Sequence, residues 1–266
     1  MKITIIGCGN MGLIYARAFL KYNILSKENL LLAEKNEIRK LELLKLGVGQ
    51  VTVVNDSKIA ESDIIIIAVK PQDFEELSKE LKPLLNKAKC IISIMAGMKI
   101  KQIEQALNNV NIIRAMPNSP AELGMGMTAF TANKSVPIEE IRKAENLLGT
   151  TGRCVFLENE DLLDGVTALS GSGPAYFFYL VKHMIEAGKE MGFDEATSAM
   201  FVKQTMLGSF HLINNANKSL DELIKSVASK GGTTEAAFSV FMDAHIGENL
   251  QKGIVKARDR SIELSK

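Results

Sequence analysis

The chain has 266 residues, of which 46% are hydrophobic and 24% charged, and Lys plus Arg exceed Asp plus Glu by one. This composition is typical of a globular protein of one or two domains, and the near-neutral charge argues against nucleic acid or an acidic membrane surface as a partner. No apolar run approaches the ~20 residues of a membrane span, and an apolar strand follows Met1 and Lys2 directly, so we expect no leader, no membrane partner and a cytoplasmic location. The three cysteines are far apart without a CxxC pattern, so we expect buried thiols of a reducing compartment.

The first element is an apolar strand over residues 2–6, which runs into GCGNMG at residues 7–12 and then into a helical pattern. This spells GxGxxG, in which Gly7 allows a tight bend, Gly9 lets a pyrophosphate approach and Gly12 permits close helix packing. The next strand, residues 30–33, ends at Glu34, near the ~20-residue spacing expected for a ribose-binding acid. The alternative is that Glu34 is simply a charged residue at the end of the strand and binds no ligand.

Strands and helices then alternate, which predicts a doubly wound, mostly parallel sheet. Further strands are expected over residues 51–54, 64–69, 90–95 and 112–116, with helices such as 38–46 and 74–84 between them. Because ligands bind outside the carboxyl ends of such strands, we expect the loops there to line one crevice. These loops contain Lys70-Pro71, Ala96-Gly97 and the PNSP run at residues 117–120. For each loop taken by itself, the alternative is that the proline only ends the strand and that the loop binds nothing.

After strands at residues 128–132 and 153–157, with a helix over 139–148 between them, only helical periodicity remains. The helices are expected over residues 161–168, 174–191, 195–213, 220–226, 234–243 and 246–264. We therefore predict a dinucleotide-binding domain over residues 1–157 and an all-helical domain over residues 158–266.

One long helix is expected within LSGSGPAYFFYLVKHMIEAGKEMG at residues 169–192, with Ser172 as N-cap, Pro174 in the first turn and Gly192 at its end. Its residues 175–181 are all apolar or aromatic, so this segment needs cover on every side. A partner's helices would supply that cover, which predicts an obligate homodimer. SGSGPA fits either a plain helix start or a turn whose N–H groups receive an anion or cofactor.

Two kinds of catalysis lack support in the sequence. The three histidines, His183, His211 and His245, lie far apart outside any ligand motif, so no metal site is expected. Ser170 and Ser172 lack the GxSxG elbow of a serine hydrolase. The SKGGTT run at residues 229–234 either offers backbone N–H groups to a carboxylate at a helix start, or is a helix N-cap with a glycine hinge.

Taken together, GCGNMG at residues 7–12, AVKPQ at 68–72, MPNSP at 116–120, LSGSGPAY at 169–176 and KGGTT at 230–234 resemble the pyrroline-5-carboxylate reductase family. The resemblance covers essentially the whole chain in order and spacing. It implies a Rossmann-like domain followed by an all-α dimerisation domain. It also implies reduction of 1-pyrroline-5-carboxylate to L-proline, the last step of proline biosynthesis, with NADPH or NADH.

The resemblance also implies roles for individual residues. The cofactor-binding residues would be Gly7, Gly9, Asn10, Met11, Gly12, Glu34, Asn55, Ala68, Lys70, Pro71, Ala96 and Gly97. The substrate-binding residues would be Glu160, Gly231, Gly232, Thr233 and Thr234, with Thr234 also catalytic through its hydroxyl on the ring nitrogen. Positioning of an already electrophilic imine would supply most of the catalysis, which agrees with the lack of an evident acid.

Two departures from the family pattern affect these expectations. Glu34-Lys35 stands where a small residue or an asparagine-arginine pair is common, which favours use of NADH, and Lys230 stands where proline is common. The family likeness further implies rings of five dimers. The alternatives are another imine, hydroxy-acid or amino-acid dehydrogenase of the same architecture, or a non-catalytic dinucleotide sensor.

Overall fold

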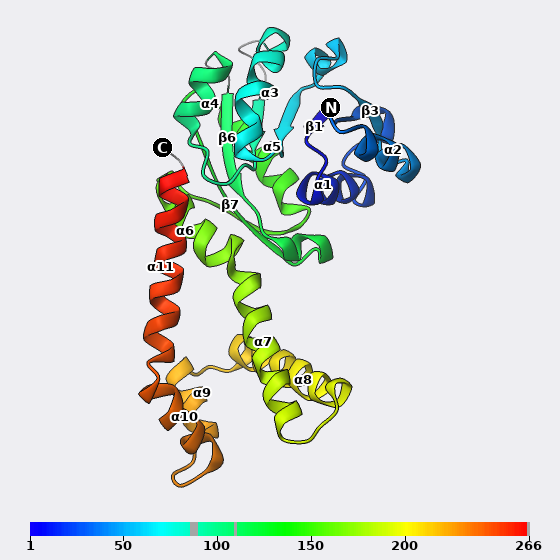
Figure 1. Cartoon of the computed structure of the whole chain (residues 1–266). Helices are drawn as coiled ribbons and strands as arrows, with labels where there is room; N and C mark the ends of the chain where they lie inside the picture. Colours follow the sequence, from blue (N-terminus) through cyan, green and yellow to red (C-terminus); the bar gives the residue numbers. More distant parts are fainter. Residues whose placement is uncertain (86–89, 109–110, 265–266) are drawn as a thin grey trace. The chain divides into compact units, whose positions relative to one another are not determined.

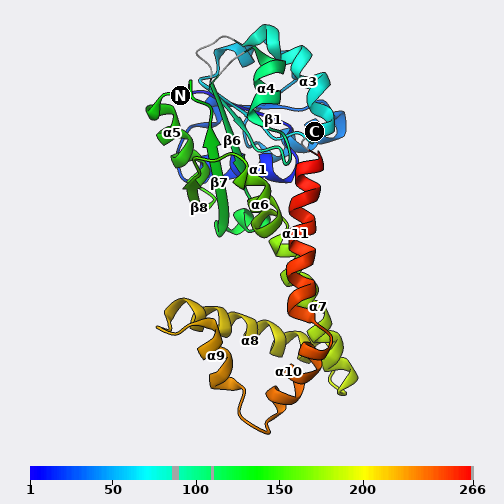
Figure 2. The same cartoon turned by 90° about the vertical axis from the view of Figure 1, so that its left-hand side faces the viewer.

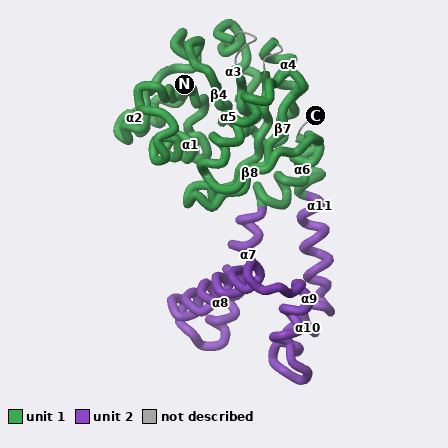
Figure 3. The backbone as a smooth tube through the Cα atoms, turned by 180° about the vertical axis from the view of Figure 1, so that it is seen from behind, with its two compact units in different colours: residues 1–172, 257–266 green, residues 173–256 purple. Residues whose placement is uncertain are grey.

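The computed structural model describes residues 1–85, 90–108 and 111–264, and the chain divides into two compact units (Figure 3). Unit 1 comprises Met1–Ser172 and Ala257–Lys266, and unit 2 comprises Gly173–Lys256. The second boundary lies inside the last helix of the chain, so this helix contributes to both units. The functional division at residues 157 and 158 stays a prediction, because compactness does not say which residues bind a ligand.

The strands of unit 1 form one sheet in the order β3-β2-β1-β4-β5-β6-β7-β8 (Figure 1). Its strands are β1 (Ile3–Ile6), β2 (Leu30–Ala33), β3 (Gln50–Thr52), β4 (Ile64–Ile67), β5 (Cys90–Ser93), β6 (Asn111–Met116), β7 (Gly126–Ala132) and β8 (Gly152–Phe156). Every neighbouring pair is parallel except β6 and β7, so the predicted doubly wound, mostly parallel sheet is confirmed.

Helices cover both faces of this sheet. Those of unit 1 are α1 (Asn10–Lys21), α2 (Glu37–Leu46), α3 (Phe74–Leu81), α4 (Ile100–Leu107), α5 (Ile138–Gly149) and α6 (Leu162–Val166). Short 3-10 turns are η1 (Lys27–Asn29), η2 (Ser57–Glu61), η3 (Pro71–Asp73), η4 (Lys82–Leu84) and η5 (Ser119–Leu123). The buried residues of α1 and α5 share one apolar cluster, and those of α3 and α4 share the other.

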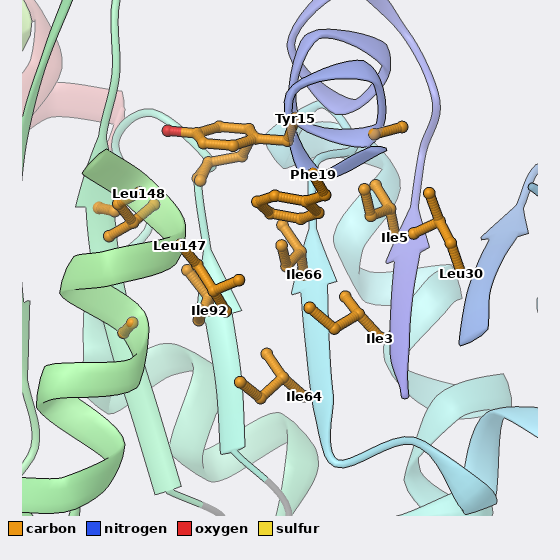
Figure 4. Packing of buried hydrophobic residues seen from close by; sticks show 14 of the residues in the cluster. Ile3, Ile5, Tyr15, Phe19, Leu30, Ile64, Ile66, Ile92, Leu147 and Leu148 are labelled. Atoms are coloured by element: carbon orange, nitrogen blue, oxygen red, sulfur yellow. The ribbon is translucent and has the colours of Figure 1, made fainter. Parts of the chain in front are cut away.

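The strands supply the core because they are apolar on both faces. All four residues of β4 are isoleucines and all are buried. On the α1 side, Tyr15 and Phe19 pack with Ile5, Ile66 and other strand residues (Figure 4). Each fully buried side chain of this size stabilises the fold by about 1.5 to 3 kcal/mol, so these two clusters hold the sheet rigidly under the loops at its carboxyl edge.

The chain order reverses at β1, which lies between β2 and β4. In such sheets a ligand crevice forms at the carboxyl ends of the strands on either side of the reversal. The strand predicted over residues 51–54 is wrong at its end, because β3 stops at Thr52, whose carbonyl accepts from Glu34 N. Val53 and Val54 leave the sheet there and line the crevice instead.

Unit 2 is helical throughout, with α7 and α8 in mutual contact and the shorter α9 and α10 after them (Figure 2). The helices are α7 (Gly173–Glu190), α8 (Glu195–Asn215), α9 (Leu220–Val227), α10 (Thr233–Asp243) and α11 (Ile246–Leu264), the last of which ends in unit 1. The predicted N-cap at Ser172 is wrong: a π-helical turn, Thr167–Gly171, runs into α7, and Ser172 N donates to Thr167 O at 2.8 Å. Gly192 does end α7, with a positive φ of 96°.

Across residues 1–85, 90–108 and 111–264, no helix is long and apolar enough to cross a membrane.

Candidate dinucleotide and substrate sites

The glycine loop between β1 and α1 has three glycines that are needed for different reasons. Gly7 has a φ of 85°, and a Cβ there would lie 2.8 Å from Val69 N. A Cβ on Gly12 would lie 2.5 Å from the carbonyl oxygen of Gly7. Gly9 differs, because a Cβ there meets nothing within 4 Å. Gly7 and Gly12 therefore shape the loop itself, whereas Gly9 keeps open the space outside the helix.

Gly9 is also the N-cap of α1, and no side chain caps this helix start. The first-turn N–H groups, which belong to Asn10, Met11 and Gly12, have no intrahelical partner. A helix N-terminus of this kind attracts anionic groups such as a pyrophosphate. The loop thus presents donors, a positive helix end and free space in one place.

A cavity of about 490 Å³ lies beside this loop at the carboxyl ends of the strands. Six of the predicted cofactor residues line it: Gly7, Gly9, Glu34, Asn55, Ala68 and Lys70. The predicted Pro71 opens η3 directly after Lys70. The cavity has the size expected of a small-molecule site and includes the open space in front of Gly9.

Glu34 joins the end of β2 to the glycine loop. Its Oε2 accepts from Cys8 N at 3.0 Å, and its Oε1 accepts from the backbone N–H groups of Lys35 and Asn36 at 2.9 and 3.0 Å. A carboxylate has about four lone-pair sites, so these three bonds leave capacity for one further donor such as a ribose hydroxyl. Burial, followed by the Glu34 charge, raises the pKa of the neighbouring Cys8 thiol to about 12.

Asp73 and Glu76 are among the acidic residues that line the cavity and that the sequence motifs missed. Their carboxylates lie 3.2 and 3.4 Å from Lys35 Nζ, which links the segment after β2 to η3 and α3. A signal for them exists in the sequence, since both follow the carboxyl end of β4 closely. Their pairing with Lys35, however, depends on the order of strands in the sheet.

Ala96 and Gly97 follow β5, and Gly97 lies beside the end of α11. Gly97 has a φ of 73°, and a Cβ there would lie 3.4 Å from Leu264 Cβ. The structure therefore places Gly97 in unit 1, against the last turn of α11. Its predicted position near the nicotinamide-side ribose stays a prediction.

Glu160 lies at the partly exposed end of a polar network in unit 1. Its Oε1 accepts from Ile100 N at the start of α4 at 2.8 Å and from Arg114 at 2.9 Å. Arg114 and Asp164 have side chains only 2% exposed and pair at 3.4 Å, and Ser261 of α11 donates to Asp164 at 2.8 Å. Glu160 thus has a structural role, and its contact with substrate stays a prediction.

Arg114 was also missed in the sequence, although it carried a signal. It is the charged residue of β6 (Asn111–Met116), in which every other residue after Asn111 is apolar, and a buried charge requires a partner. The partner Asp164 lies 50 residues away, and the pattern alone did not identify it.

Residues 231–234 lie in unit 2 at the start of α10. Gly231 has a φ of 73°, and Gly232 is the N-cap of α10, so the N-cap position falls on neither threonine. Gly231 N donates to Glu235 Oε2 at 2.6 Å, which shows that an anionic oxygen fits this turn. Helix α10 begins at Thr233, so Thr234 is its second residue.

Comparison with known proteins decides between the dehydrogenase classes that share this fold. A family model described as pyrroline-5-carboxylate reductase dimerisation matches residues 160–264, and one described as NADP oxidoreductase coenzyme F420-dependent matches residues 2–97. The pyrroline-5-carboxylate reductase of Haemophilus influenzae is 33% identical over 98% of this chain and 97% of its own length. The chain belongs to the pyrroline-5-carboxylate reductase family.

Solved structures of this reductase family agree over the full length. The crystal structure of the Plasmodium falciparum pyrroline carboxylate reductase with NADP bound has a TM-score of 0.89 and 26% identity, and covers 100% of this chain and 98% of that one. A pyrroline-5-carboxylate reductase from Coxiella burnetii has a TM-score of 0.86 and 30% identity, with coverage of 100% and 98%. The predicted family and fold class are therefore confirmed.

Proposed function

We propose that this chain catalyses the NAD(P)H-dependent reduction of 1-pyrroline-5-carboxylate to L-proline, the last step of proline biosynthesis. The observation that carries this proposal is the full-length kinship with pyrroline-5-carboxylate reductases, combined with a glycine loop that opens onto a cavity. When bound, the reduced nicotinamide supplies the hydride that the imine carbon accepts.

The residues of unit 1 fit a dinucleotide. The start of α1 at Asn10, Met11 and Gly12 would hold the pyrophosphate, because its N–H groups are uncapped and Gly9 leaves space in front of them. Glu34 would accept from the adenosine ribose. Asn55, Ala68, Lys70 and Pro71 would border the groove, with Ala96 and Gly97 on the nicotinamide side.

The residues of unit 2 would hold the substrate. Backbone N–H groups at Gly231, Gly232 and Thr233 would bind its carboxylate, and the Thr234 hydroxyl would bond the ring nitrogen. The Glu235 carboxylate on Gly231 N supports an anion at this turn, and it would have to yield to the substrate. Glu160 would border the same substrate, and it already bonds Arg114 and the start of α4.

We also propose that NADH is accepted at least as well as NADPH. A carboxylate at Glu34 bonds a 2′-hydroxyl and repels a 2′-phosphate. Steady-state kinetics with both cofactors at equal imine concentration test this. A large preference for NADPH would show that Glu34 does not face the ribose.

We further propose a homodimer through the helices of unit 2, and rings of five dimers. The matched dimerisation family model and the apolar residues that unit 2 leaves exposed support the dimer.

The direct test is conversion of chemically prepared 1-pyrroline-5-carboxylate to L-proline near neutral pH. Product analysis should detect proline in step with oxidation of NADH or NADPH, and Thr234→Ala measured beside the wild type should be slower. Cofactor oxidation without proline, or no oxidation with either cofactor, would overturn the proposal.

A further inference from the structure

The cavity beside the glycine loop is lined by more acidic than basic side chains. The charged residues of its lining are Glu34, Lys35, Glu37, Lys40, Lys70, Asp73, Glu76 and Glu80. Five of these are carboxylates and three are lysines. A ligand that carries an additional phosphate dianion therefore meets repulsion at this rim unless one of the cations turns toward it.

The cations that follow Glu34 are already paired with carboxylates. Arg39 pairs with Glu42 at 2.7 Å and Lys40 with Glu37 at 2.5 Å, both within α2. Lys35 is different, because its partners lie on another element. Its Nζ contacts Asp73 Oδ1 of η3 at 3.2 Å and Glu76 Oε2 of α3 at 3.4 Å.

Lys35 occupies the place from which a cation can meet a 2′-phosphate in this fold. The acid at the end of β2 faces the adenosine ribose, and a basic residue nearby accommodates the phosphate of NADP. Lys35 is adjacent to that acid. Hydrogen bonds from Lys35 to Asp73, and secondly to Glu76, raise the pKa of its ammonium group and direct this group toward the two carboxylates.

We propose that Asp73 and Glu76 are specificity-determining residues that disfavour NADP(H) relative to NAD(H). They do so by holding Lys35 away from the 2′ position of the adenosine ribose. This inference depends on one part of the proposed function, namely that the cavity binds a nicotinamide dinucleotide. The residues act from the strand-β4 side of the cavity, across from Glu34, and so add a second determinant to the one at the end of β2.

The ion pairs are solvent-exposed, which limits the size of the effect. Side-chain exposure is 60% for Lys35, 36% for Asp73 and 72% for Glu76. Exposed pairs of this kind are weak individually, so releasing both should change the preference by about three- to tenfold rather than reverse it completely.

The experiment is direct binding of NAD+ and NADP+ to the full-length protein by titration calorimetry. The variant Asp73→Asn/Glu76→Gln should bind NADP+ about three- to tenfold tighter, with NAD+ affinity nearly unchanged. The matched control is Glu75→Gln, which removes a carboxylate from the same helix, where Glu75 pairs with Lys79 at 3.0 Å. The control should keep the wild-type ratio of the two affinities.

A third variant separates release of Lys35 from a general loss of negative charge. Adding Lys35→Gln to the Asp73→Asn/Glu76→Gln variant should remove the gain for NADP+. An unchanged affinity ratio in the double variant, or a gain that survives Lys35→Gln, would overturn the inference. Because binding is measured without turnover, a failure to reduce the imine would count against the proposed function and leave this result intact.

Discussion

At the scale of single residues, a substitution at Gly9 tests cofactor binding without disturbing the fold. A Cβ at this position meets nothing within 4 Å and the backbone φ is −65°, so Gly9→Val should fold normally. Its side chain would fill the space in front of α1, and dinucleotide affinity should fall at least ~100-fold, or ~2.7 kcal/mol. Calorimetric titration with NAD+ measures the affinity, and a thermal melt checks the fold.

Gly12 provides the matched control for this prediction. A Cβ there would lie 2.5 Å from a backbone oxygen, so Gly12→Ala should lower the free energy of unfolding by about 1 to 3 kcal/mol. If Gly9→Val kept wild-type affinity, the pyrophosphate would not lie at the start of α1.

The buried thiols predict a loss of stability in alkali. Burial raises the pKa of Cys8 and Cys90 from 9.0 to about 12, so the folded state retains protons that the unfolded state loses above about pH 9. The free energy of unfolding should therefore fall between about pH 9 and 12, by at most ~1.4 kcal/mol per pH unit for each thiol. Urea unfolding at about pH 8 and about pH 10.5 measures this.

Cys90→Ala is the comparison variant for the alkaline series. It should lose stability in absolute terms because β5 is central, but its decline with pH should be shallower than that of the wild type. Equal slopes would show that Cys90 is not the source. For the same reason the forward reaction near neutral pH is a safer assay than proline oxidation at high pH.

At the scale of elements, the start of α10 tests the substrate site. Thr234→Ala leaves the backbone N–H groups of the turn in place and removes one hydroxyl, so the loss should fall on turnover and substrate binding while cofactor affinity stays the same. One hydrogen bond to a group whose charge changes in the reaction is worth ~1 to 3 kcal/mol, or about tenfold to a hundredfold in kcat/KM.

Thr234→Ser is the matched variant, because it restores the hydroxyl and should recover most of the activity. The structure places the N-cap on Gly232, so removal of the Thr234 hydroxyl should cost little stability. Wild-type kinetics in Thr234→Ala, or a fall in melting temperature that accounts for the whole effect, would exclude the catalytic role.

Local patterns predicted the elements well, but they did not predict contacts between distant elements. The glycine loop and Glu34 could be assigned because strand, turn and acid follow one another in sequence. The ion pairs of Lys35 with Asp73 and Glu76 could not be predicted in this way. Lys35 follows β2 and the two acids follow β4, and these segments meet only because β1 pairs with both strands. The N-cap expected at Ser172 failed for a different reason, because the π-helical turn before α7 continues the helical backbone through the glycine-serine run.

At the scale of the whole molecule, the two units differ in whether they bury their own apolar side chains. Both apolar clusters described above lie in unit 1. The hydrogen bond from Ser261 to Asp164, which are 97 residues apart, fixes the end of α11 to the same unit. Among the residues of unit 2, all of which the structure describes, Val202 is the only large apolar side chain that is buried. A helical unit without its own core is stable only if something else covers its apolar residues.

Helix α7 shows where that cover is needed. Phe177, Phe178 and Tyr179 are consecutive and are 55%, 69% and 64% exposed within one chain. Their exposure extends around the helix, because consecutive residues point about 100° apart, so packing within the same chain does not account for this segment. The sequence predicts burial on all sides for residues 175–181, and a second subunit would reconcile that prediction with the exposure.

We therefore expect Phe178→Glu to disrupt the oligomer. A charge in a buried interface has lost its hydration, and the missing ring removes ~2 to 3 kcal/mol of apolar burial per subunit, so the variant should dissociate or aggregate and lose activity. The matched control is Leu41→Glu in α2, which is 58% exposed in unit 1 and should keep both mass and activity. Light scattering on a sizing column measures the mass of each variant beside the wild type. An active wild-type monomer at micromolar concentration, or a Phe178→Glu variant with wild-type mass, would contradict a dimer built on α7.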